Sequence, residues 1–137
     1  MLVITHSLVA AASAPAIFAV YRDVAGWPTW DPDTRSAVLH GGLTLGATGT
    51  LVPTKGRAIP ITVTALQPDQ AFTLTSKTWA FHLVFEHELT PAPGGTEILH
   101  RVRIGGLLKP LLARILVPAI NHGLPITLAR LKARVEG

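Results

Sequence analysis

The sequence contains no cysteine and few charged residues. Without cysteine, the chain can form no disulfide framework, no thiolate zinc site and no cysteine nucleophile. Charged residues make up only 15% of the chain, against about 25% in a typical soluble domain, whereas 48% are apolar. This composition excludes intrinsic disorder, and it indicates extra apolar surface, either in a large core or around a cavity.

Acidic residues are the scarcer charge, with 8 Asp and Glu against 12 Lys and Arg and a net charge of +4. The basic residues form no run of five, and exposed aromatic residues do not alternate with them, so we expect no nucleic-acid partner. Glycine-rich phosphate loops, dinucleotide loops and a Gly-x-Ser-x-Gly motif are also absent. We therefore expect no cofactor.

Two segments resemble membrane signals without meeting their requirements. Residues 1–16 end in small residues, as a signal-peptide cleavage region does, but no Lys or Arg precedes Arg22. Residues 107–126 are very apolar, but two basic residues and three prolines interrupt them, which argues against a spanning helix. We expect residues 1–137, which show no repeat or linker, to form one soluble, cytoplasmic domain.

The hydrophobic pattern predicts the order strand, helix, short helix, six strands and long helix. Ser13 is a candidate N-cap of the first helix, Gly26 its end, and residues 27–32 a turn or one-turn helix. Pro60 places the fourth strand at an edge or bulge. The first five strands are predicted over residues 2–9, 34–40, 50–53 and 59–65 and around residues 72–76.

The sixth and seventh strands each have one apolar face. The other face of the sixth strand carries two carboxylates, whose burial would be costly, so the apolar faces are predicted to point inward. If Thr90 pairs with Glu97, His87 lies directly opposite His100, and a slip of two residues would make them diagonal neighbours. The inward residues are Trp79, Phe81, Leu83, Phe85, His87 and Leu89, followed by Ile98, His100, Val102 and Ile104.

From residue 107 the apolar residues recur at spacings of three or four, which predicts a long amphipathic helix that Pro118 and Pro125 kink or segment. An antiparallel sheet with one apolar face needs a cover, and this helix is the only element large enough. Large aromatic residues would line the space between them, and a filled core without a cavity is the ordinary alternative. The helical stripe comprises Leu108, Leu112, Leu116, Ile120, Leu124, Leu128, Leu131 and Val135.

Residues 14–32, with their Trp27-Pro28-Thr29-Trp30 motif, resemble a known family, as do residues 85–89, 95–102 and 106–125. In these stretches and in its order of elements, the sequence is similar to the START-like, birch-pollen-allergen-like superfamily called SRPBCC. The branch it resembles is described as polyketide cyclase/dehydrase and lipid transport. The resemblance implies an α+β helix-grip fold, in which a curved seven-stranded antiparallel sheet wraps around a long C-terminal helix. It also implies two short helices after the first strand, and an internal cavity for a lipid, polyketide, steroid or other apolar molecule.

The resemblance leads us to expect a carrier or sensor of a small hydrophobic molecule, bound between the sheet and the C-terminal helix. The alternative is a polyketide cyclase or dehydratase type of enzyme, with His87 and His100 as catalytic acid and base. A third hypothesis is a protein-interaction module that uses the same fold without a ligand. The predicted ligand-binding residues are Phe72, Trp79, Phe81, Phe85, His87, His100, Leu112, Leu116 and Ile120.

The inward histidines allow three interpretations. They are structural groups that hydrogen-bond to each other, to a hydroxyl or to water; they orient or protonate a ligand; or they bind a metal such as zinc. The superfamily fold places the first strand beside the seventh, which implies a row of His6, His100 and His87. Because this spacing is not a recognised zinc motif, we predict no metal site.

Several further residues have a structural and a functional interpretation. Asp31 and Asp33, which flank Pro32, suit a turn and N-cap better than catalytic work, and Trp27 and Trp30 suit a helix corner better than ligand stacking. Basic residues of the last helix form either a solvated face or a transient contact with anionic lipid headgroups. The sequence is compatible with a monomer or a homodimer. These basic residues are Lys109, Arg114, Arg130, Lys132 and Arg134.

Overall fold

Seven antiparallel strands form one continuous sheet in the computed structural model, which describes residues 1–137. The sheet order is β1-β7-β6-β5-β4-β3-β2, so the first strand of the chain lies beside the last. The strands are β1 (Leu2–Ala10), β2 (Thr34–Leu39), β3 (Thr48–Pro53), β4 (Ile59–Gln67), β5 (Ala71–Lys77), β6 (His82–Ala92) and β7 (Gly95–Gly105). The helices are α1 (Ala14–Arg22), the 3-10 helix η1 (Val24–Thr29) and α2 (Lys109–Glu136).

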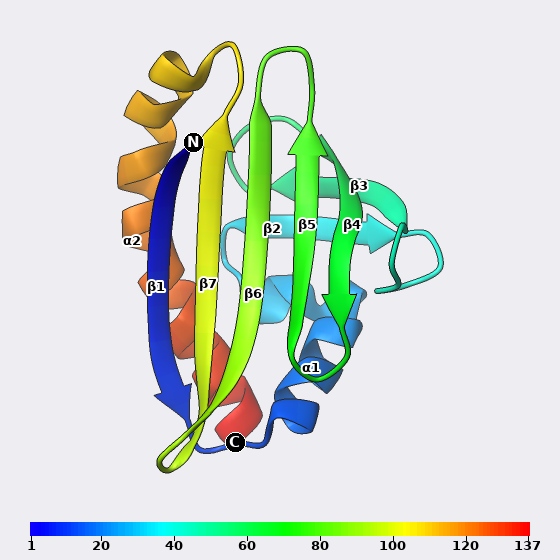
Figure 1. Ribbon diagram of the computed structural model, residues 1–137, viewed down its shortest axis with the longest axis vertical. Coiled ribbons are helices and arrows are strands. Elements are labelled where there is room, and N and C mark those ends of the chain that lie inside the picture. The colour runs from blue at the N-terminus through cyan, green and yellow to red at the C-terminus, as the bar shows by residue number, and fades with distance from the viewer.

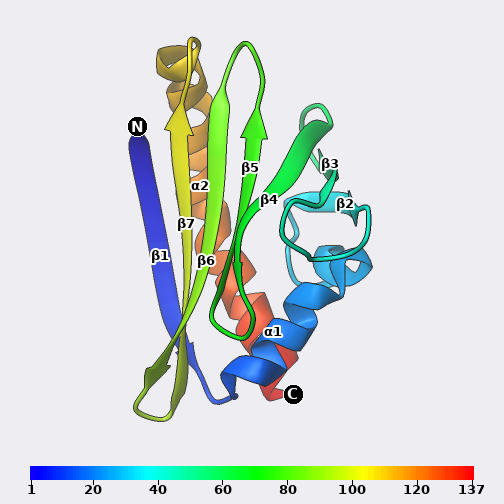
Figure 2. The same ribbon diagram turned by 45° about the vertical axis from the view of Figure 1, so that its right-hand side comes forward.

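The sheet curls strongly, because β2 and β3 run across the direction of the other five strands (Figure 1). The long helix α2 lies along the concave side, and α1 closes the end near the C-terminus (Figure 2). This arrangement confirms the predicted α+β helix-grip fold and the predicted order of elements.

The β6–β7 hairpin has the predicted register, with Thr90 opposite Glu97 and His87 opposite His100. Two glycines make its turn possible. Gly94 and Gly95 both have positive φ, of 85° and 151°. A Cβ at Gly95 would also lie 1.9 Å from the carbonyl oxygen of Ala10, so no larger residue fits where β1 ends against β7.

The corner between α1 and β2 has the predicted cap but an earlier helix end than the sequence indicated. The Ser13 hydroxyl oxygen caps α1 by accepting from the Ala16 amide at 3.3 Å. The helix ends at Arg22 rather than near Gly26, because the chain tightens into η1. Trp27 is buried there, and its indole N–H donates to the Tyr21 carbonyl at 2.9 Å, so the side chain is anchored at this corner.

The helix α2 differs along its length. It continues as a single helix through Pro118 and Pro125, so the predicted segmentation is wrong. Each proline removes one backbone donor, and the remaining hydrogen bonds hold the helix together. None of the residues 109–122 is buried, whereas Gly123, Thr127, Leu128 and Leu131 are. Only the C-terminal half of α2 therefore belongs to the main core.

The placement of Trp79 is the main error of the sequence-based prediction. The strand β6 begins at His82, and the residues before it form a turn. In this turn the Thr78 hydroxyl accepts from the amides of Ala80 and Phe81, at 3.2 and 3.3 Å. Strand alternation does not continue through a turn, so the side-chain parity of the strand does not apply to Trp79. Its side chain is 81% exposed and does not line the cavity.

Candidate functional site

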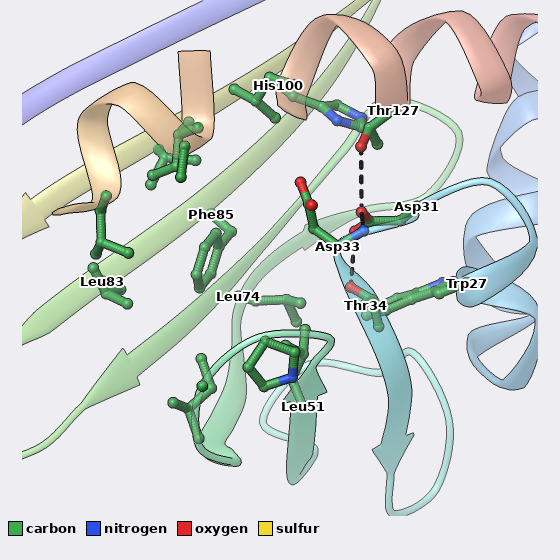
Figure 3. Close-up of a pocket in the computed structure, with 18 of the residues that line it drawn as sticks. Trp27, Asp31, Asp33, Thr34, Leu51, Leu74, Leu83, Phe85, His100 and Thr127 are labelled. Carbon is green, nitrogen blue, oxygen red and sulfur yellow. Dashed lines mark hydrogen bonds between the residues drawn. The ribbon is translucent and has the colours of Figure 1, made fainter. Parts of the chain in front are cut away.

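A cavity of about 510 Å³ lies between the concave face of the sheet and α2. Its presence excludes the filled core that was the ordinary alternative. Its surface is mostly apolar, and the lining includes side chains of β5, β6, β7 and α2, several of which are seen in Figure 3. Eight of the nine predicted ligand-binding residues line it: Phe72, Phe81, Phe85, His87, His100, Leu112, Leu116 and Ile120.

The inner face of α2 follows from helical periodicity. Leu112, Leu116 and Ile120 recur every four residues and therefore share one side of the helix. All three line the cavity and are only half-buried, and Leu116 and Ile120 also pack against a small apolar cluster of β1, β6 and β7. The cavity thus explains why an apolar helix packs so few of its residues.

The two inward histidines are neighbours but bond to other groups. Their ring centroids are 4.7 Å apart and their planes are inclined by 76°. The imidazole of His87 stacks on Phe72, with centroids 3.9 Å apart, and its Nδ1–H donates to the Phe72 carbonyl at 3.2 Å. The Nε2 atom of His100 shares a hydrogen bond of 2.8 Å with the Tyr21 hydroxyl, an interaction that the sequence did not indicate.

Burial determines the charge of both histidines. It lowers the pKa of His87 to about 4, against smaller opposing effects of the Phe72 carbonyl and Glu86. Burial, together with the neighbouring His87, lowers the pKa of His100 well below its usual value. Burial also raises the pKa of Tyr21. All three side chains are therefore neutral near pH 7 and act as hydrogen-bonding groups.

One nitrogen of this group remains available. The fully enclosed side-chain atoms without a hydrogen-bond partner are Trp30 Nε1 and Ser76 Oγ. The Nε2 atom of His87 has no protein partner either, and since it is not among the enclosed atoms it is open to the cavity. With Nδ1 carrying the proton, Nε2 is an acceptor. It suits a hydroxyl or N–H group of a bound molecule.

The predicted histidine row exists in the register but does not form a metal site. His6 pairs with His100 across β1 and β7, as the resemblance implied. However, the His6 imidazole hydrogen-bonds to the Asn121 side chain of α2 at 2.9 Å. No three His, Asp or Glu side chains are placed to hold a metal ion together.

A polar group at one end of the cavity was not predicted. Asp31 has the expected turn role, since its carboxylate accepts from the Asp33 amide at 3.1 Å and the Thr34 hydroxyl at 2.8 Å. It also accepts from the Thr127 hydroxyl of α2 at 3.2 Å, as Figure 3 shows. Burial raises the pKa of Asp31, which the hydrogen bonds from Thr34 and Asp33 partly oppose.

Glycine allows α2 to approach this polar group closely. A Cβ on Gly123 would lie 2.2 Å from a carboxylate oxygen of Asp33. Gly123 and Thr127 are four residues apart on the same side of α2 as Leu116 and Ile120. In the sequence, a glycine and a threonine interrupt the leucine-rich stripe of this helix. This interruption was the available signal for a polar group at the cavity. Lys55 and Arg57, at the cavity edge in the β3–β4 loop, had no such signal.

Known structures share this architecture. A protein from Mesorhizobium loti superimposes with a TM-score of 0.79 at 13% identity, over 96% of this chain and 95% of that chain. Norcoclaurine synthase from Thalictrum flavum gives a TM-score of 0.73 at 17% identity, over 98% and 86%. A protein from Deinococcus radiodurans gives 0.69 at 22% identity, over 98% of both chains.

These similarities concern the fold. A search of curated protein sequences finds no match. The model of the family described as polyketide cyclase / dehydrase and lipid transport matches residues 1–136, which is nearly the whole chain. The chain therefore belongs to the polyketide cyclase/dehydrase and lipid transport family.

Proposed function

We propose that the protein binds a small hydrophobic molecule, lipid-like or polyketide-like, in the cavity between the sheet and α2, as a carrier or sensor. The observation that carries this proposal is the apolar cavity of about 510 Å³. Cavities of roughly 300–1,000 Å³ are typical of sites that enclose small molecules. Burial of apolar ligand surface supplies about 25 cal/mol per Å², before the costs of ordering.

The polar groups give the ligand an orientation. The acceptor nitrogen of His87 and the Asp31–Thr127 pair lie among apolar walls. A ligand with one hydroxyl group and a larger apolar body satisfies both environments. We therefore propose an amphipathic molecule rather than a pure hydrocarbon.

Catalysis of the cyclase or dehydratase type is the second candidate, because titratable groups line the same cavity. The low pKa of His87 makes it a poor general acid near pH 7, whereas the raised pKa of Asp31 favours proton transfer by that carboxyl. In this alternative the cavity also folds the substrate into a reactive geometry. Norcoclaurine synthase, by its name an enzyme, has the same fold.

A cavity-filling substitution tests the binding proposal. Leu116→Trp places an indole inside the cavity, and we expect it to weaken binding of a fluorescent fatty acid at least about tenfold. Val38→Trp, on the exposed face of β2, is the matched control and should bind like the wild type. Equal affinity of both variants would place the ligand elsewhere.

A second experiment separates binding from catalysis. His87→Phe preserves the stacking on Phe72 but removes the acceptor nitrogen. We expect weaker binding of hydroxylated probes and unchanged binding of hydrocarbon probes. Native mass spectrometry of freshly purified protein should detect a bound molecule and identify its class. Turnover of that molecule, lost in Asp31→Asn while affinity persists, would favour the enzyme.

A further inference from the structure

Two loops at one end of the molecule lie side by side. The Thr78–Phe81 turn and the β7–α2 connection are adjacent in both Figure 1 and Figure 2, at the top of each view. The Leu108 amide donates to the Ala80 carbonyl at 2.8 Å, which joins the two loops. Gly106, with φ of 100°, lets them pack closely, because a Cβ there would lie 2.7 Å from the Cα of Phe81.

This end carries large apolar side chains that face solvent. Trp79 is 81% exposed, Leu107 73%, Leu111 56% and Ile115 62%. Leu111 and Ile115 are four residues apart on α2, and neither lines the cavity. We call Trp79, Leu107, Leu111 and Ile115 the apical patch. Clusters of exposed apolar side chains mark interaction surfaces more often than chance exposure does.

The helix behind the apical patch is more apolar than its packing requires. An 18-residue stretch of α2 has a mean hydropathy of 1.4, apolar enough by length and composition to cross a membrane. Only 17% of that stretch is buried. The inner side faces the cavity, so the cavity accounts for the apolar residues on that side. The outer side has no partner within the chain.

The charges in the two segments that carry the apical patch are all of one sign. Neither residues 70–85 nor residues 98–135 contain an Asp or Glu. Three cations in these segments take part in none of the ion pairs of the structure, namely Lys77, Lys109 and Arg114. The ion pairs involve other cations, such as Arg101, which pairs with Glu86, and Lys132, which pairs with Glu136.

The start of α2 adds to this positive potential. Its first turn contains no acidic residue, Lys109 is its first residue, and Leu108 makes no side-chain cap. A helix N-terminus carries partial positive charge and is stabilised by acidic neighbours. A lysine there, without a cap, costs helix stability but attracts an anion. The arrangement therefore favours an anionic partner.

We infer that the apical patch docks onto the surface of a bilayer containing anionic phospholipid. Trp79 and the leucines enter the interface between headgroups and acyl chains, while Lys77, Lys109 and Arg114 contact the phosphates. A second copy of the chain would bring like charges together, so self-association fits this surface poorly. Phe81 and Leu112, from the same two segments, line the cavity, so docking brings the cavity close to the membrane.

Vesicle flotation tests this inference without any cavity ligand, so its outcome is separate from that of the proposed function. We expect the protein to float with vesicles of phosphatidylcholine and phosphatidylserine, to bind pure phosphatidylcholine much less, and to dissociate at high salt. Lys109→Glu with Arg114→Glu should weaken binding at least about 25-fold, since each cation contributes roughly fivefold and each glutamate adds repulsion. Trp79→Ser with Leu111→Ser should lower it at least about tenfold.

Leu45→Ser is the matched control, because Leu45 is 67% exposed in the β2–β3 connection. It should bind like the wild type. Trp79 provides a direct signal as well, because Trp27 and Trp30 are buried. Its fluorescence should shift to the blue on anionic vesicles, and the shift should be lost in Trp79→Phe.

Three results would overturn the inference. These are equal binding to neutral and anionic vesicles, an equal loss in Leu45→Ser, or no binding at all. A dimer that dissociates in Leu111→Ser, without vesicle binding by the wild type, would assign the patch to self-association instead.

Discussion

His87 and His100 lie directly opposite each other on β6 and β7, yet each forms its hydrogen bond with an aromatic residue rather than with the other. His87 donates to the carbonyl of Phe72, on which it stacks, and His100 bonds to the hydroxyl of Tyr21. Each histidine is thus fixed by the aromatic cluster around α1. Because His87 uses Nδ1 for the Phe72 carbonyl and does not bond to His100, its Nε2 atom stays free as an acceptor.

The buried histidines make stability depend on pH. The pKa of His87 is about 4 in the folded protein and about 6.5 when unfolded. Between these values the unfolded state binds the extra proton, so the free energy of unfolding decreases as pH falls from 6.5 towards 4. The loss from His87 is at most about 3 kcal/mol, and His100 adds to it in the same direction.

Urea unfolding at pH 7.5 and pH 5 measures this effect. His87→Phe should reduce the difference in stability between the two pH values, whereas His40→Asn, at an exposed position, should not. An unchanged pH dependence in His87→Phe would contradict burial as its cause.

The Tyr21–His100 hydrogen bond should be worth a measurable part of the stability. Tyr21→Phe keeps the ring contacts with Phe18 and Phe72 but leaves a buried imidazole nitrogen without its partner. We expect a loss of about 1–3 kcal/mol in the free energy of unfolding. Thr64→Val removes an exposed hydroxyl pair and should cost less than about 0.5 kcal/mol. Equal losses in the two variants would show that the buried hydrogen bond contributes no more to stability than the exposed one.

Adjacent glycines in the β6–β7 turn should respond differently to alanine. Gly94→Ala meets no atom within 4 Å and should cost about 1–2 kcal/mol for its positive φ alone. Gly95→Ala adds a collision with the Ala10 carbonyl at 1.9 Å, so we expect at least about 2 kcal/mol more. Thermal unfolding of both variants measures the difference, and similar melting temperatures would argue against the tight contact between β1 and β7.

Truncations along α2 should reveal its two halves. Leu131→Ala, in the main core, should cost about 2–5 kcal/mol. Leu116→Ala enlarges a space that already exists and should cost about 1–2 kcal/mol, and Leu111→Ala should change stability by less than about 0.5 kcal/mol. Chemical denaturation of the three variants measures how the loss of stability changes along the helix. A cost at Leu116 equal to that at Leu131 would mean that the cavity closes in solution.

The sequence predicted well where local pattern and geometry coincide. The parity of two alternating strands joined by a short turn placed His87 and His100 on the same buried face, and the structure has the first of the two registers considered. The spacing of leucines indicated the inner side of α2. Trp79 was misplaced because an alternating pattern does not reveal where a strand ends. The Asp31–Thr127 contact joins residues 96 positions apart, and no periodicity relates an aspartate in a turn to a threonine in a helix.

The uneven packing of α2 has a consequence for the local stability of the helix. Its last turns are locked into the core by Leu128 and Leu131, while its first three turns hold no buried side chain. Opening the first turns breaks fewer buried contacts than opening the last turns, which would disrupt the main core. We therefore expect amide exchange in the first turns of α2 to be faster than in its last turns.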